Sequence, residues 1–206
     1  MNKINKNIFL KAKKNKKALF FPKLINQSPD WNSFIKALNY KFNLDKDNQN
    51  DKFIKNNKGQ STDIYLNNNL DPQFWYAAQR KDLINNGGCL PYLPEIKDFI
   101  NTINPVLGNS PWFIKGLINF VGNDGNLNVH NDGQDVISWT CIGEVEYRIY
   151  ENFEPDSDGN LNPTGKEYTS YMMNPGDVIF MPAGVIHHAI LKEPRASLIL
   201  DFYMEE

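Results

Sequence analysis

The sequence predicts a mainly β fold in which helices precede the strands, and three observations support this. After Pro105, short strand-like runs alternate with turn-forming clusters. Before Pro105, apolar residues recur at the three- and four-residue spacing of amphipathic helices. The 206 residues are a usual length for one domain with a substantial core. Many short strands at even spacing predict a sandwich or a small barrel.

The first part of the chain is expected to contain little regular structure before its first long helix. Residues 1–30 look irregular, apart from a short apolar strand at 18–21. A helix is predicted over residues 31–42 from its apolar spacing, with Asp30 as its N-cap. Residues 44–70 are rich in Asn, Asp and Lys and are expected to form an exposed loop, either a mobile one or a lid.

Two further helices are predicted before the strands begin. One spans residues 72–83, with Asp71 as its cap, and the other runs from about residue 94 to 103. We therefore expect a helical or irregular extension over residues 1–111, packed on a β core over residues 112–206. The predicted strand runs of that core are 112–121, 128–132, 136–150, 167–173, 177–182, 187–191 and 196–204.

Charge is balanced overall but uneven along the chain. The net charge of −2 gives no global field that would favour a nucleic acid or a membrane. The lysines of the first segment are either a basic arm for an anionic partner or a solvated, partly frayed terminus, and the absence of interleaved aromatic residues favours the terminus. These lysines are Lys3, Lys6, Lys11, Lys13, Lys14, Lys16, Lys17 and Lys23.

The cysteines and the apolar runs indicate the expected surroundings of the protein. Cys89 and Cys141 have no metal-knuckle or redox spacing, so two buried reduced thiols are expected. Reduced thiols favour a cytoplasmic location. No apolar stretch approaches the roughly 20 residues that span a bilayer, and no secretory signal is expected.

Two imidazoles and one carboxylate form the candidate metal-binding set. His130 and Asp132 lie two residues apart, so on a strand they would point to the same face. His187 follows near the C-terminus of the chain, at the start of a predicted strand. Such a set suits a redox-active Fe(II) with open coordination positions. The His-x-Asp pair alone is weak support, because it occurs by chance in many surface loops.

The segment before His187 is more specific. Gly176 is followed after five residues by Pro182, then by Gly184 after one residue and by His187 after two. This pattern resembles the second conserved motif of the cupin superfamily. The resemblance implies a double-stranded β-helix (a jelly-roll or cupin barrel) from about residue 112 to 202, with His187 as a metal ligand. His188 would then face the other way, in a packing or supporting role.

The full set is similar to that of the Fe(II)/2-oxoglutarate oxygenases, in particular the cupin-like or JmjC-like hydroxylases. The first cupin motif usually has His-x-His and a later Glu, whereas here a carboxylate, Asp132, follows His130. Two imidazoles and one carboxylate leave three cis positions free for a bidentate co-substrate and O2. The resemblance implies Fe(II), 2-oxoglutarate and O2, with succinate, CO2 and a hydroxylated substrate as products. It also implies a possible homodimer.

A 2-oxoglutarate enzyme needs a cation for the distal carboxylate. Arg195 and Ser197 lie two apart after His187, and an arginine fork can bind a carboxylate bidentately. This Arg-x-Ser is similar to the 2-oxoglutarate motif of several oxygenase subgroups. JmjC-like hydroxylases often use a lysine on the strand after His-x-Asp, but residues 143–148 contain none. Supporting contacts are expected from Asn119, Asn128 and Lys115, with Trp139 and Tyr147 lining the cavity.

Two other functions remain open. One is a cupin dioxygenase or isomerase without 2-oxoglutarate, in which the substrate itself binds the metal and Arg195 grips a substrate carboxylate or is structural. The other is a non-catalytic cupin binding module with a vestigial site, although the intact ligand set argues against it. The substrate is not encoded in the motifs, and a small molecule or a protein side chain is expected rather than a nucleic acid.

Overall fold

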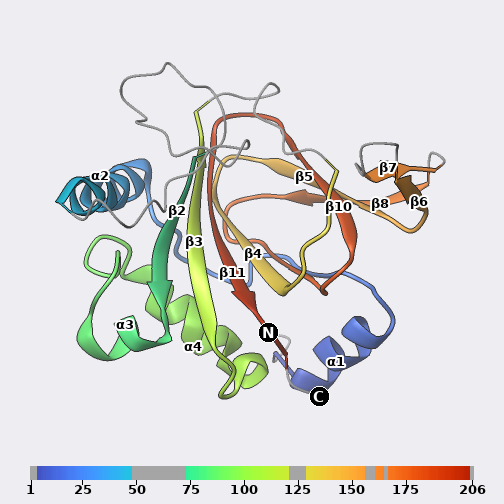
Figure 1. Cartoon of the computed structure of the whole chain (residues 1–206), viewed down its shortest axis with the longest axis horizontal. Helices are drawn as coiled ribbons and strands as arrows, with labels where there is room; N and C mark the ends of the chain where they lie inside the picture. Colours follow the sequence, from blue (N-terminus) through green and yellow to red (C-terminus); the bar gives the residue numbers. More distant parts are fainter. Residues whose placement is uncertain (1–3, 48–72, 121–128, 156–160, 165–166, 205–206) are drawn as a thin grey trace.

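Two antiparallel sheets form the body of the protein in a computed structural model that describes residues 4–47, 73–120, 129–155, 161–164 and 167–204 (Figure 1). The larger sheet has the order β1-β9-β4-β11-β3-β2, and the smaller has the order β10-β5-β8. The larger sheet comprises β1 (Leu19–Phe21), β9 (Val178–Met181), β4 (Asp135–Ile142), β11 (Arg195–Phe202), β3 (Trp112–Asn119) and β2 (Gln73–Gln79). The smaller comprises β10 (Ile186–Leu191), β5 (Val145–Tyr150) and β8 (Tyr168–Met173).

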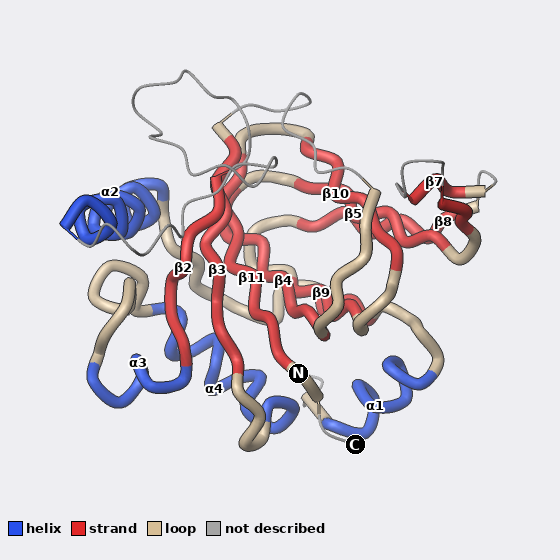
Figure 2. Tube along the Cα trace, in the orientation of Figure 1, coloured by secondary structure: helices blue, strands red, loops and turns tan. Residues whose placement is uncertain are grey.

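Helices cover the outer face of the larger sheet. The helix α2 (Trp31–Asp47) and the helix α4 (Glu95–Leu107) bury apolar side chains in one core with the strands, and α1 (Lys6–Lys14) adds Phe9. The short helix α3 (Arg80–Asn85) follows β2 directly. Figure 2 shows α2, α3 and α4 gathered on the side of β2 and β3, while α1 lies beside the C-terminus and also contacts α4.

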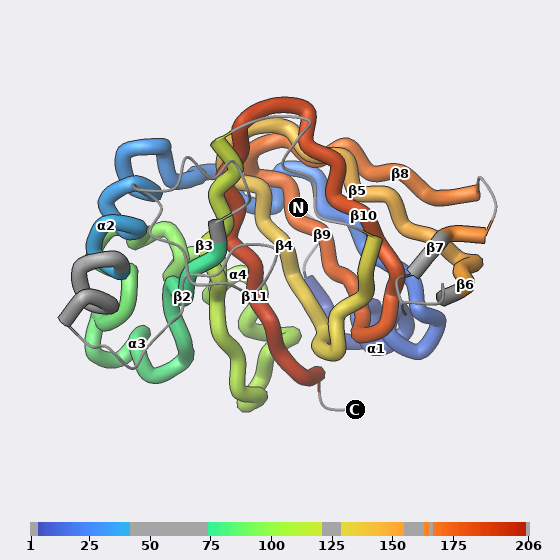
Figure 3. The backbone as a smooth tube through the Cα atoms, turned by 45° about the horizontal axis from the view of Figure 1, so that its top comes forward, coloured from blue at the N-terminus to red at the C-terminus, as the bar shows by residue number. Residues whose placement is uncertain are grey.

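One core lies between the helices and the larger sheet, and a second lies between the two sheets. The strand β11 contributes side chains to both. Ala196, Leu198 and Leu200 pack into the helix-side core, whereas Ile199 belongs to the core shared with β5, β8 and β10. All eight residues of β11 are buried, although Arg195, Ser197 and Asp201 are polar or charged. Figure 3 shows β10, β5 and β8 running side by side apart from the larger sheet. This arrangement confirms the predicted jelly-roll barrel with helices on one side.

The predicted helix over residues 72–83 is wrong for most of its length. Residues Gln73–Gln79 form β2, and the helix α3 begins only at Arg80. The apolar residues there belong to two faces, since Phe74 packs against the core between the sheets and Trp75 is buried on the helix side. Pairing with β3 favours the strand, and Gly116 on β3 makes room, because a Cβ there would lie 2.3 Å from the Trp75 ring. Asp71 and Pro72 lie outside the described residues.

The expectation of irregular structure over residues 1–30 is wrong at α1. The Asn5 side chain accepts a hydrogen bond from the Asn7 backbone at 2.9 Å, which satisfies one of the free N–H groups at the start of the helix. Phe9 and Ala12 are buried, so the helix is fixed by packing. Lysines in its last turn interact favourably with the negative end of the helix dipole. The basic segment is therefore a folded part of the protein where the structure describes it.

Other elements agree with the sequence expectations. The short strand β1 is present, and Asp30 caps α2 by accepting from the Ser33 N–H at 2.8 Å. The helix α4 continues past its expected end to Leu107. Of the expected loop at 44–70, residues 44–47 belong to α2 and the remainder lies outside the described residues.

The long predicted run at 136–150 is two strands, β4 and β5, separated at Gly143, whose φ of +74° suits glycine. An additional hairpin of β6 (Phe153–Pro155) and β7 (Leu161–Pro163) follows β5. The larger sheet takes its two edge strands from residues before 112 and its four inner strands from those after. The division into 1–111 and 112–206 stays a prediction.

Both cysteines are free and buried, as expected. None of the helices in the described residues has the length and apolar character needed to cross a membrane.

Candidate active site

The three predicted metal ligands converge at one point. One ligand atom from each of His130, Asp132 and His187 can be chosen so that all lie within 4.8 Å of one another. The His187 Nε2 and Asp132 Oδ2 atoms are 3.7 Å apart, and the two imidazole centroids are 4.3 Å apart. His187 is buried, whereas the Asp132 side chain is 34% exposed, so the cluster is open to solvent on the Asp132 side.

Backbone hydrogen bonds bring these residues together. His130 and His187 exchange two of them, with N···O distances of 3.0 and 2.9 Å, and the Gly184 N–H donates to the Asp132 carbonyl at 2.8 Å. The run at 128–132 is not a regular strand in its described part, because His130 forms only an isolated bridge to His187. Convergence of His130 and Asp132 thus depends on these long-range bonds and not on strand alternation.

The tautomer and charge of His187 suit a metal ligand. Its Nδ1 lies 3.0 Å from the Val185 carbonyl, which can only accept, so Nδ1 carries the proton and Nε2 keeps its lone pair. Burial, with a contribution from His130, lowers the pKa of His187 to about 4. The imidazole is therefore neutral at neutral pH, the form that binds a metal. His188 pairs in register with Arg148 on the outer face of the smaller sheet.

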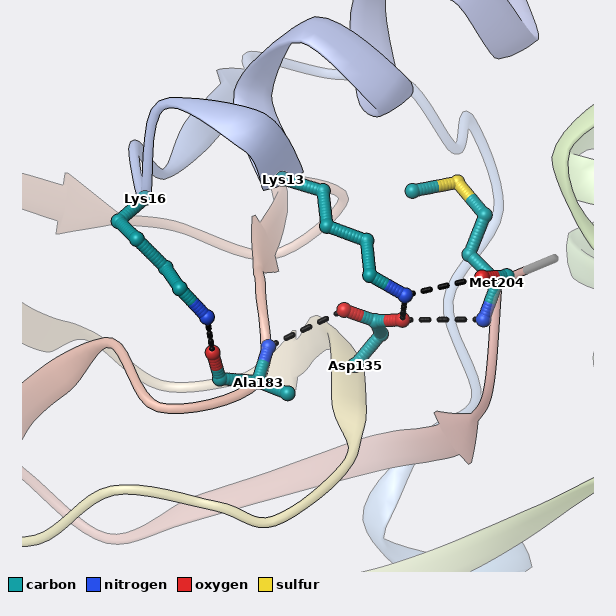
Figure 4. Close-up of polar contacts among 5 residues, drawn as sticks. All are labelled: Lys13, Lys16, Asp135, Ala183 and Met204. Atoms are coloured by element: carbon teal, nitrogen blue, oxygen red, sulfur yellow. Dashed lines mark hydrogen bonds and ion pairs between the residues drawn. The ribbon is translucent and has the colours of Figure 1, made fainter. Parts of the chain in front are cut away.

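A buried carboxylate supports the turn that leads to His187, and the sequence analysis missed it. Asp135 accepts hydrogen bonds from the backbone of Ala183 at 3.1 Å and of Met204 at 3.0 Å (Figure 4). The Lys13 ammonium of α1 donates to it at 2.9 Å, and Lys16 donates to the Ala183 carbonyl at 2.5 Å. One carboxylate thus joins α1, the Pro182–Gly184 turn and the end of β11.

A cavity of about 130 Å³ opens beside the metal-ligand cluster, between the two sheets. Its walls are mainly apolar, with a few polar groups that face the cluster. It is lined by Phe74, Lys115, His130, Asp132, Val136, Ser138, Tyr147, Met181, His187, Ala189 and Ile199. Tyr147 is a lining residue as expected, but Trp139 is not, because it packs on Phe99 in the helix-side core.

Arg195 lies on the barrel side of β11 and is 1% exposed. Its Nε donates to the Asn119 Oδ1 at 3.2 Å, whereas its Nη1 has no hydrogen-bond partner among the described residues. The buried hydroxyls of Ser197 and Thr140 likewise have none there, and these two residues are register partners on β11 and β4. A buried cation beside unpaired hydroxyls is costly in the free protein and suits an anionic ligand.

Of the predicted co-substrate residues, the structure therefore brings together Arg195, Ser197 and Asn119, while Asn128 lies outside the described residues. Thr140 was missed. Its position two residues after Ser138 places it on the same face of β4, but a single threonine in an apolar strand does not by itself indicate a ligand contact.

Tyr147 connects the metal-ligand cluster to Arg195. Its ring centroid is 6.3 Å from that of His187, and its hydroxyl oxygen is 3.0 Å from the Ser138 Oγ. Burial lowers the pKa of the Arg195 guanidinium, and the Tyr147 hydroxyl opposes that shift. The cation site and the metal-ligand cluster therefore belong to one interior.

An ion pair between β3 and β11 also lies beside the cavity. The Lys115 Nζ is 2.6 Å from the Asp201 Oδ2, with Lys115 on β3 and Asp201 on β11. Burial raises the pKa of Asp201, the Lys115 ammonium lowers it, and the carboxylate of Asp132 raises it. The pair is thus close enough to the metal-ligand cluster to act on it electrostatically.

Comparison with known proteins shows which family model and which solved structures this chain resembles. Residues 113–205 match the family model of the JmjC domain. A search of the curated proteins by sequence finds no match. Among solved structures, the X-ray structure of Escherichia coli YcfD is similar, with a TM-score of 0.59 and 14% identity over 98% of this chain and 54% of that chain.

Two complexes of the same protein are also similar. YcfD, named a ribosomal oxygenase from Escherichia coli, matches in complex with cobalt and succinic acid with a TM-score of 0.60 and 13% identity, over 97% of this chain and 51% of that chain. Its complex with cobalt and 2-oxoglutarate matches with a TM-score of 0.59 and 13% identity, over 97% and 52%. The chain thus spans about half the length of the YcfD chains, and at this identity the likeness shows the fold. Residues 113–205 therefore resemble a JmjC domain in sequence, and the chain shares the fold of YcfD.

Proposed function

We propose that this protein is an Fe(II)- and 2-oxoglutarate-dependent oxygenase, with His130, Asp132 and His187 as the iron ligands. One observation carries the proposal: these residues converge beside a cavity, and a buried guanidinium with an unpaired N–H lies on the same barrel interior. The YcfD complex with cobalt and 2-oxoglutarate supports it, since that protein has the same fold.

The donor set fits Fe(II). Two neutral imidazoles and one carboxylate are the ligands of non-haem Fe(II) oxygenases, and they leave positions free for a bidentate ligand and O2. When bound, iron with 2-oxoglutarate and O2 supplies oxidative decarboxylation to succinate and CO2, together with hydroxylation of a C–H bond. The Val185 carbonyl holds the His187 ring by accepting from Nδ1, so Nε2 faces Asp132.

The co-substrate fits the polar groups on the barrel interior. Arg195 binds the distal carboxylate through its guanidinium, and Ser197 and Thr140 donate from their hydroxyls. Asn119 orients the guanidinium by accepting from Nε, which leaves Nη1 for the ligand. Arg195 itself is 1% exposed, and burial of this kind strengthens a charged contact.

The primary substrate is a small molecule or a protein side chain. Since YcfD is named a ribosomal oxygenase, a component of the ribosome is the first candidate substrate to examine.

Metal binding by paired variants tests the proposed ligands. Adjacent residues His187 and His188 make a matched pair, because only His187 lies in the metal-ligand cluster. In calorimetric titration with Mn(II), we expect His187→Ala to lose at least about 100-fold in affinity, since even supporting partners of metal ligands contribute about 10–100-fold. His188→Ala should bind Mn(II) as the wild type does.

The proposal fails if wild-type protein binds no divalent metal, or if the two histidine variants bind equally well. Metal binding without any 2-oxoglutarate binding would instead support a cupin enzyme whose substrate is its own metal ligand.

A further inference from the structure

The ion pair of Lys115 and Asp201 has no part in the proposed function, although it lies beside the iron ligands. Lys115 lines the cavity with His130, Asp132 and His187, and its side chain is 33% exposed. Asp201 is 2% exposed and is not one of the residues that line the cavity. A buried carboxylate at this place needs an explanation, since burying charge is costly.

Asp201 is poorly satisfied by its surroundings. The Lys115 Nζ, 2.6 Å from Oδ2, is its ion-pair partner, and Oδ1 has no hydrogen-bond donor in the described part of the chain. Apolar Ile199 lies two residues before it on the same face of β11. A buried carboxylate beside a site, with an ion-pair partner but no donor to its other oxygen, is a candidate for a functional role.

The charges around the cavity explain what the pair can do. Asp201 adds negative charge near Asp132, which favours a bound cation and disfavours an incoming dianion. Lys115 cancels that charge on the cavity side. An ammonium has three donors, and because a buried carboxylate anchors it, it stays at the cavity wall instead of extending into water.

We propose that Lys115 and Asp201 are a charge-balancing pair: Asp201 strengthens metal binding, and Lys115 cancels its repulsion so that a dianionic co-substrate can enter beside the metal. Both act through the electrostatic field and are positioning residues. The inference rests on the proposed function, because it takes 2-oxoglutarate as the dianion.

A double-mutant cycle tests the pair by binding alone. Mn(II) affinity, and then 2-oxoglutarate affinity of the Mn(II)-loaded protein, would be measured without O2 for wild type, Lys115→Met, Asp201→Asn and the double variant. Removing one charge at a few ångströms in a partly buried site changes the affinity for an ion by about tenfold. Lys115→Met should therefore bind 2-oxoglutarate about tenfold more weakly, with Mn(II) affinity unchanged or higher.

The other variants give opposite effects. Asp201→Asn should bind Mn(II) about three- to tenfold more weakly, while 2-oxoglutarate binds as well as before or better. The double variant should recover 2-oxoglutarate affinity to within about threefold of wild type, because neither charge remains. Lys115→Arg should behave as wild type. A merely structural role predicts that both affinities fall together.

The inference is overturned if Lys115→Met binds 2-oxoglutarate as wild type does, or if the double variant stays as weak as Lys115→Met. That second result would mean that the ammonium contacts the ligand directly, independently of Asp201. If wild-type protein loaded with Mn(II) fails to bind 2-oxoglutarate, the proposed function itself is refuted, which is a distinct result.

Discussion

Replacing Arg195 by methionine should separate binding from stability. Methionine keeps much of the buried volume but removes the cation. In the free protein, Arg195 is 1% exposed, has one hydrogen bond to Asn119 at 3.2 Å, and has an Nη1 without a partner among the described residues. A buried, incompletely paired guanidinium lowers the stability of the ligand-free protein. The substitution should therefore weaken 2-oxoglutarate binding but leave the folding stability unchanged or raise it.

The magnitudes follow from the contacts. Two charge-assisted hydrogen bonds to a carboxylate contribute about 1.5–3 kcal/mol each, so their loss should weaken 2-oxoglutarate binding by at least about 3 kcal/mol, or at least about 100-fold in Kd. For folding, the lost bond to Asn119 costs about 1 kcal/mol, and removal of a half-satisfied buried charge offsets it. We expect the free energy of unfolding to stay within about 1 kcal/mol of wild type or to rise.

The assay is calorimetric titration of Mn(II)-loaded protein with 2-oxoglutarate, together with thermal unfolding of the metal-free protein. Arg148→Met is the matched control, because Arg148 pairs with Glu146 on the outer face of the barrel strand β5 and should not affect affinity. If Arg195→Met keeps 2-oxoglutarate affinity within about threefold of wild type, Arg195 is not the carboxylate anchor. A melting temperature lowered by more than about 10 °C would assign it a structural role instead.

Three further predictions concern stability. Gly116→Ala should destabilise the protein by about 1–3 kcal/mol in denaturant unfolding, because the new methyl group would overlap the Trp75 ring; an unchanged midpoint would contradict the packing. Asp135→Asn should cost about 2–3 kcal/mol and weaken Mn(II) binding, because one amide oxygen cannot replace the three contacts of the carboxylate; normal stability would refute its role. The Arg148 hydrogen bond lowers the pKa of Glu146 to about 2, so its ionised form stabilises the fold above pH 4.5 and that stabilisation is lost as pH falls from 4.5 to 2. Glu146→Gln should therefore lower the free energy of unfolding by only about 0.5–1 kcal/mol at pH 7, because the site lies on the outer face. The variant should also lose less stability than the wild type between pH 4.5 and 2. An unchanged pH profile would show that the ionised Glu146 contributes nothing to stability.

The barrel and its metal-ligand cluster could be predicted from sequence because their signals are local. The turns around Gly176 and Pro182 fix where β9 begins and ends, so their spacing to His187 predicts where that residue lies at the start of β10. The strand β2 was misassigned because its apolar residues serve two cores, and only pairing with β3 decides its conformation.

Features that depend on distant partners could not be predicted. Asp135 contacts Lys13 across 122 positions and Ala183 across 48, so nothing near it in sequence marks it as a support for the site. Thr140 faces Ser197 only through the register of β4 with β11. In the helix α1, the buried residues Phe9 and Ala12 are surrounded in sequence by lysines, so the apolar face of the helix could not be recognised.

The most direct test of the proposed function is an anaerobic titration of Fe(II)-loaded protein with 2-oxoglutarate, followed by visible absorption. A visible charge-transfer band that saturates with added 2-oxoglutarate is the predicted result, since bidentate chelation of the iron requires the three ligands and the free positions together. Iron that stays bound while no band appears at any 2-oxoglutarate concentration would contradict the proposed function.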